Sequence, residues 1–169
     1  VENVTEDFKM QGRPQMQSRP QMQSRPRMQE QYSYDIELGT SCAVTQAMGP
    51  IAISSSKKES IWVLDSGIDG SHKDLKVDRK YSKSFVGGNP LVDVAGHGTH
   101  VSGIAAASAK GNSSDFRMNG VAEAANLIAL QVLDSNGEGY WSGIISALDH
   151  VAKFGLRGDV VILSLGTYN

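Results

Sequence analysis

An aspartate and a histidine in this sequence have the flanking residues that acid–base chemistry requires. Asp65 ends the apolar run of residues 61–64, and His97 lies in the Gly-His-Gly-Thr-His segment of residues 96–100. An ionised aspartate that accepts a hydrogen bond from one imidazole nitrogen fixes the tautomer of the ring, and the other nitrogen can then take a proton from a nucleophile. We therefore predict an acid–base pair. We also expect the glycines on either side of His97 to leave room for a substrate backbone.

A metal site is a second hypothesis for the same segment. His97 and His100 could act as ligands together with Asp93. Zinc sites usually add cysteine or further clustered histidine, which this segment lacks. We therefore favour the acid–base pair and predict no metal site. His100, one turn inside a predicted helix, is interpreted as a packed, hydrogen-bonded residue.

Strand and helix signals alternate from residue 61 onward. The predicted elements are strands at residues 61–64, 127–133 and 160–165, and helices at residues 97–107 and 142–154, the second of them ending at Gly155. The residues expected on the buried face of the second helix are Ile144, Ile145, Leu148, Val151 and Ala152. This order predicts an α/β fold of three layers, in which helices cover a mostly parallel sheet.

The predicted sheet also explains how distant residues could meet. Ligands of such sheets bind beyond the carboxyl ends of the strands. Asp65, Asp134 and Gly166 all fall at such ends. The expected site is therefore at this edge of the sheet.

Four segments, in the same order, make the sequence similar to the subtilisin-like serine proteases. They are residues 61–69 together with 72–75, which include Asp-Ser-Gly at 65–67, and residues 96–105, 130–139 and 160–166. The resemblance implies that Asp65 is the triad aspartate and His97 the triad base. It also implies two strand edges that hold an extended peptide, formed by Gly137, Glu138 and Gly139 and by Ser164, Leu165 and Gly166.

The resemblance implies a serine-type endopeptidase that hydrolyses peptide bonds through an Asp-His-Ser triad. Its expected partners are a peptide or protein substrate and an N-terminal propeptide or inhibitor, and its expected location is extracellular or in the secretory pathway. In the family, the oxyanion asparagine and the nucleophilic serine come later in the chain. We therefore expect the domain to continue past Asn169, with two triad members in this fragment. The alternative is a truncated or pseudo-protease fragment that binds peptides without cutting them.

A short segment at residues 39–43, Gly-Thr-Ser-Cys-Ala, imitates the serine motif of that family. Its serine precedes the aspartate and the histidine, which is the wrong order. Ser41 is therefore interpreted as an ordinary loop or helix-start residue. No cofactor is predicted with certainty, and the resemblance suggests only a structural calcium ion, with Asp74 at a ligand position.

A six-residue repeat occupies residues 9–30, with prolines at positions 14, 20 and 26. Regular prolines block a continuous helix, and one methionine per unit supplies little apolar surface. We predict a disordered arm at residues 1–31 that acts as a spacer or interaction tail. Residues 32–58 then form a lead-in segment, and residues 59–169 form a partial catalytic domain.

The composition excludes several other classes of protein. The chain has 169 residues, of which 40% are hydrophobic, and a net charge of −2, so no basic surface points to nucleic acid or an anionic membrane as a partner. No apolar run approaches the roughly 18 residues of a membrane helix. The single cysteine, Cys42, excludes an internal disulfide.

Overall fold

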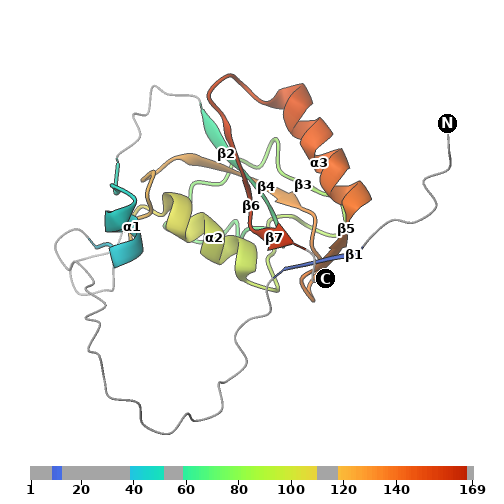
Figure 1. The fold of residues 1–169 in the computed structure, drawn as a ribbon, viewed down its shortest axis with the longest axis horizontal. Helices are drawn as coiled ribbons and strands as arrows, with labels where there is room; N and C mark the ends of the chain where they lie inside the picture. Colours follow the sequence, from blue (N-terminus) through green and yellow to red (C-terminus); the bar gives the residue numbers. More distant parts are fainter. Residues whose placement is uncertain (1–8, 13–38, 52–58, 110–117, 167–169) are drawn as a thin grey trace, which may run out of the picture.

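The computed structural model describes residues 9–12, 39–51, 59–109 and 118–166 (Figure 1). The helices are α1 (Cys42–Gln46), α2 (His97–Ala106) and α3 (Trp141–Phe154). The strands are β1 (Lys9–Gly12), β2 (Ser60–Asp65), β3 (Lys83–Ser84), β4 (Asn126–Gln131), β5 (Glu138–Tyr140), β6 (Val160–Leu163) and β7 (Leu165–Gly166). None of the described helices is long and apolar enough to cross a membrane.

The main sheet has four strands in the order β3-β4-β2-β6, and all neighbours are parallel. β2 lies in the middle, with Asp65 opposite Gln131 at the end of β4. This confirms the predicted parallel sheet and puts the carboxyl ends of β2, β4 and β6 at one edge. β3 was not predicted, because two residues carry no hydrophobic pattern.

Helices cover both faces of this sheet, which confirms the predicted three layers (Figure 1). Successive side chains of β2 alternate between the faces, as the strand geometry requires. Trp62 and Leu64 pack with α3, while Val63 packs with the small residues of α2. The α2 face is lined by Ala106 and Ala107, so this helix can lie close to the strands.

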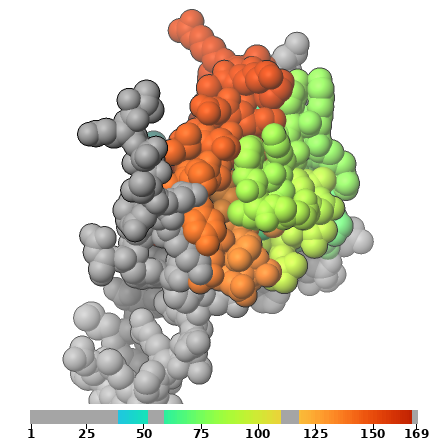
Figure 2. Space-filling model, turned by 90° about the vertical axis from the view of Figure 1, so that its right-hand side faces the viewer, coloured from blue at the N-terminus to red at the C-terminus, as the bar shows by residue number. Residues whose placement is uncertain are grey.

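The buried face of α3 differs from the prediction. Ile144 and Ala147 are buried, and Val151 packs against them, which is a stripe at helical spacing. Ile145 is 57% exposed and Leu148 is 40% exposed, and Ala152 is exposed as well. The predicted stripe was therefore rotated toward solvent. In Figure 2, α3 belongs to the darker orange surface in the upper part of the molecule.

The predicted strand at residues 160–165 is in fact two strands. β6 ends at Leu163, and after Ser164 the chain enters β7, which belongs to a second sheet of order β5-β1-β7. Its central strand, β1, lies in the arm that we predicted to be disordered. The residues of β1 pair through their backbones with β5 on one side and β7 on the other, a cause that the composition of the arm does not display. The rest of the arm lies outside the described residues.

The exposed edge of the main sheet generates a prediction. β6 pairs with β2 on one side only among the described strands, and Val160 and Leu163 are 54% and 43% exposed. Such an apolar edge favours pairing with other chains. We expect concentration-dependent association of the 169-residue chain in sedimentation velocity, and we expect Val160→Lys to reduce it. A monodisperse parent chain that unfolds cooperatively as a monomer would contradict this expectation.

Candidate active site

Asp65 and His97 meet at the junction of β2 and α2. Asp65 is the last residue of β2, and His97 is the first residue of α2. Nδ1 of His97 lies 2.8 Å from Oδ1 and 2.9 Å from Oδ2 of Asp65. This contact engages Nδ1 and leaves Nε2 as the nitrogen that can exchange a proton with another group. The two residues therefore have the geometry of an acid–base pair.

The carboxylate of Asp65 is fully buried, whereas the side chain of His97 is 23% exposed. Burial raises the pKa of Asp65, and the hydrogen bonds from His97 and from the amide of Ser66 partly oppose this rise. Oδ1 accepts the Ser66 amide at 2.7 Å. Asp65 is thus the buried member of the pair and His97 the solvent-accessible member, which suits proton exchange at the imidazole.

A polar network fixes the start of α2, and sequence analysis did not find it. Oδ1 of Asp93 accepts hydrogen bonds from the Ser66 hydroxyl (2.8 Å) and from the amide of Gly96 (2.9 Å). Oδ2 of Asp93 accepts the amide and the hydroxyl of Thr99. Ser66 Oγ in turn accepts the Gly98 amide at 3.0 Å. These contacts satisfy amides of the first turn and hold His97 in place. The available signal was an aspartate four residues before a predicted helix.

The expectation that both glycines beside His97 leave space for a substrate is wrong for Gly98. Gly98 is buried, and a Cβ atom there would collide with the carbonyl oxygen of Gly67 and approach Cβ of Asp65. The missing side chain lets α2 lie against the end of β2. Gly96 has a φ of 77°, so its role is the left-handed turn before the helix.

His100 is exposed, which contradicts its interpretation as a packed residue. With His72 and Asp74 it lines a cavity of about 370 Å³ beside α2. No three His, Cys, Asp or Glu side chains among the described residues gather so that they could hold a metal. Both oxygens of Asp93 accept hydrogen bonds from the α2 network. The calcium ion suggested by the resemblance stays a prediction.

The two predicted peptide-binding edges lie on either side of one strand. Met10 and Gln11 of β1 pair antiparallel with Gly139 and Glu138 of β5. On its other side, β1 pairs antiparallel with Leu165 and Gly166 of β7. The structure therefore brings the predicted edges together around a slot one strand wide, and an extended segment of the same chain lies in it. We call this space the β5–β7 slot.

The remaining edge residues shape the ends of the slot. Gly137 lies in the turn before β5, with a φ of 75°, and its amide donates to the carbonyl of Asp134. The Asp134 carboxylate accepts the amides of Asn136 and Glu138, which closes this turn. Ser164 links β6 to β7. Tyr140 is 50% exposed at the end of β5.

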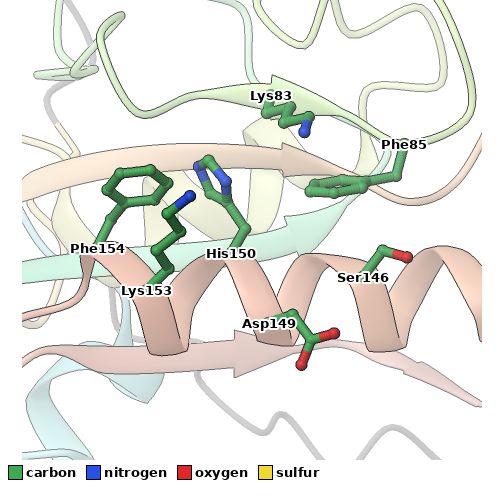
Figure 3. A pocket seen from close by; sticks show the side chains of 7 residues that line it. All are labelled: Lys83, Phe85, Ser146, Asp149, His150, Lys153 and Phe154. Atoms are coloured by element: carbon green, nitrogen blue, oxygen red, sulfur yellow. The ribbon is translucent and has the colours of Figure 1, made fainter.

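A larger hollow of about 600 Å³ lies elsewhere, between β3 and α3 (Figure 3). It is lined by Lys83, Phe85, Ser146, Asp149, His150, Lys153 and Phe154. His150 packs against the rings of Phe85 and Phe154, and its Nε2 lies 3.0 Å from the carbonyl oxygen of Tyr81. Neither Asp65 nor His97 lines this hollow, so it is separate from the acid–base pair.

Ser41 is the N-cap residue of α1, and its hydroxyl accepts the Val44 amide. This confirms its interpretation as a helix-start residue.

A family model described as the subtilase family matches residues 56–169 of the chain. The match includes β2, α2 and both edges of the slot. The chain belongs to the subtilase family. The observed α/β fold and the order of its motifs agree with this assignment.

Several curated relatives of this subtilase are subtilisins. Subtilisin E of Bacillus subtilis is 36% identical over 138 residues, which cover 80% of this chain and 34% of the relative. A subtilisin of Bacillus pumilus is 42% identical over 106 residues, covering 62% and 36%. A crystal structure of a cold adapted subtilisin-like serine proteinase matches 67% of this chain and 38% of that chain, at 29% identity and a TM-score of 0.49. The chain thus spans about a third of the length of its relatives.

Two glycines of α2 in this subtilase provide a matched test of the close contact. We expect Gly98→Ala to destabilise the fold by about 3 kcal/mol, because the new methyl group collides with the Gly67 backbone. Gly103 has open space at its Cβ position, so Gly103→Ala should stabilise the fold by roughly 0.5–1 kcal/mol through helix propensity. Urea unfolding of both variants measures the difference. Equal stability of the two variants would show that the contact is absent.

The buried carboxylate gives a pH prediction. The raised pKa of Asp65 means that the folded state binds a proton more readily than the unfolded state, in which the pKa is near 3.8. The parent should therefore gain stability relative to Asp65→Asn as the pH falls from neutrality toward 3.8. Urea unfolding at a series of pH values measures this difference. A relative loss of parent stability on acidification would mean that the pKa is lowered.

Proposed function

We propose that this subtilase chain is part of a serine-type endopeptidase that cuts extended peptides by acyl transfer. Asp65 orients and stabilises the imidazole of His97, and His97 is the general base and then the general acid. The nucleophilic serine and the oxyanion asparagine are supplied by residues that follow this segment in the complete protein. The 2.8 Å contact between His97 Nδ1 and the buried Asp65 carboxylate carries the proposal.

The proposed reaction uses Nε2 of His97 twice. Nε2 first takes the proton of the serine hydroxyl while the serine oxygen bonds to the substrate carbonyl carbon. The imidazolium then gives this proton to the leaving amine as the peptide bond breaks. In the second half, Nε2 takes a proton from water while the water oxygen bonds to the acyl carbon. The imidazolium then returns this proton to the serine oxygen as the acyl–serine bond breaks and the carboxylic acid leaves. Asp65 stays ionised throughout and keeps Nδ1 protonated.

The β5–β7 slot supports a peptide as the substrate. Its two edges offer main-chain hydrogen bonds to an antiparallel strand, as the pairing of β1 demonstrates. Main-chain recognition favours an extended segment and depends little on its side chains. By family resemblance, we place the enzyme outside the cell or in the secretory pathway.

Three variants of the complete protein test the roles of the pair. His97→Ala should lower kcat by several orders of magnitude while peptide binding persists, because the slot is intact but the proton acceptor is gone. Asp65→Asn should lower turnover on the order of ten-thousandfold by favouring the wrong tautomer. His100→Ala is the matched control, since this exposed residue lies on the same helix without touching Asp65. Peptide hydrolysis measured against pH would refute the assignment if His97→Ala kept near-parent turnover.

The 169-residue chain itself should not react with a fluorophosphonate. Ser41 caps α1 and lies outside the Asp65–His97 pair, so no activated serine is expected among the described residues. Mass spectrometry of the treated chain measures the labelling. Stoichiometric modification of Ser41 would instead support a rearranged triad.

A further inference from the structure

We propose that the hexapeptide repeat is a set of interchangeable strands for the β5–β7 slot, of which β1 is the first. The location of the slot rests on the proposed peptide-binding site, but the proposal itself concerns binding and not catalysis. The ligand class is an extended four-residue segment that contains no proline. The chain supplies several copies of this ligand to its own slot.

The register of β1 shows how little of the ligand the slot recognises. β1 has four residues, and its partners are the three residues of β5 and the two residues of β7. Gln11 is opposite both Glu138 and Gly166, so it lies at the centre of the three strands. All of these pairings are between backbones. A second segment of the same length can make them equally well, provided that it contains no proline.

The repeat supplies such four-residue segments, which we call windows, once every six residues. The first unit gives Lys-Met-Gln-Gly at residues 9–12, and the next two give Gln-Met-Gln-Ser at residues 15–18 and 21–24. A partial unit, Arg-Met-Gln-Glu, follows at residues 27–30. Each of the first three windows is followed by Arg-Pro. Because proline cannot donate to a central strand, the six-residue period leaves five proline-free residues per unit, which is enough for the four residues of β1.

The chain that connects the repeat to Gly39 also favours exchange between repeat units. All windows lie on one side of Gly39, the first described residue of the following segment. Moving from one window to the next shortens the tether by six residues and changes no backbone partner. Linked ligands that compete for one site keep it filled at a high effective concentration even when one of them is lost. A peptide from outside must therefore displace a whole series of windows and not a single strand.

Proline substitutions in the full chain test this proposal. Gln11→Pro removes an amide at the centre of β1 and should exclude the first window from the slot. A fourfold variant, with Gln11, Gln17, Gln23 and Gln29 all changed to Pro, should exclude every window. The matched control changes the same four residues to Ala, which keeps the amides. Hydrogen exchange of Glu138–Tyr140 and Leu165–Gly166 reports on the slot, and exchange of β2 reports on the fold.

We expect Gln11→Pro alone to leave exchange in the slot within about twofold of the parent, because another window replaces the first. The fourfold Pro variant should exchange on the order of tenfold faster there, with β2 unchanged, and the fourfold Ala variant should resemble the parent. Adding the synthetic peptide Gln-Met-Gln-Ser-Arg-Pro to the fourfold Pro variant should restore protection. The peptide Gln-Met-Pro-Ser-Arg-Pro should not.

Two results would overturn the proposal. Full exposure of the slot in Gln11→Pro alone would show that only the first window binds. Unchanged protection in the fourfold Pro variant would show that the arm is not the occupant. If β2 loses protection in that variant, the comparison of Gln11→Pro with the parent still decides between one window and several. No step requires turnover, so loss of the triad assignment would leave this test unaffected.

Discussion

The burial of one carboxylate is the constraint on which this structure depends. Asp65 has no solvent exposure, and an ionised group in that environment is tolerated only where hydrogen-bond donors surround it. The donors are the Ser66 amide and Nδ1 of His97. The second donor comes from a different element, so α2 must begin where β2 ends. The absence of a side chain at Gly98 makes that close approach sterically allowed.

Asp65 also links the acid–base pair to the β5–β7 slot. Its carbonyl oxygen accepts the amides of Val132 (2.9 Å) and Leu133 (3.2 Å), where the chain leaves β4. The turn closed by Asp134 follows directly and leads into β5. One residue therefore holds His97 through its side chain and positions one edge of the slot through its backbone. The proposed catalytic and binding roles therefore depend on the same junction of β2, α2 and β4.

Much of the fold was predictable from local patterns. The apolar runs of β2 and β4 and the spacing within α2 indicated these elements, and their alternation indicated a parallel sheet with Asp65 at its edge. The pairing of Asp65 with His97 followed from residue types together with that topology. These features depend on sequence periods, which a single sequence displays.

The features that were not predicted depend on contacts between distant segments, and such contacts leave no periodic pattern in the sequence. Asp93 stabilises the start of α2 through Ser66 and Thr99, and nothing near Ser66 in the sequence points to Asp93. The phase of α3 was missed because apolar residues lie on adjacent stripes, and only packing against Trp62 selects one of them. β1 forms because two distant edges offer backbone partners, a cause that lies outside its own sequence.

The tautomer of His97 in the 169-residue chain tests the central claim most directly. Imidazole ¹⁵N chemical shifts at neutral pH distinguish a protonated Nδ1 from a protonated Nε2. The Asp65 contact predicts that His97 carries its proton on Nδ1 and keeps the lone pair on Nε2, whereas exposed His100 should show a mixture of tautomers. A predominantly Nε2-protonated His97, or a mixture equal to that of His100, would contradict the account.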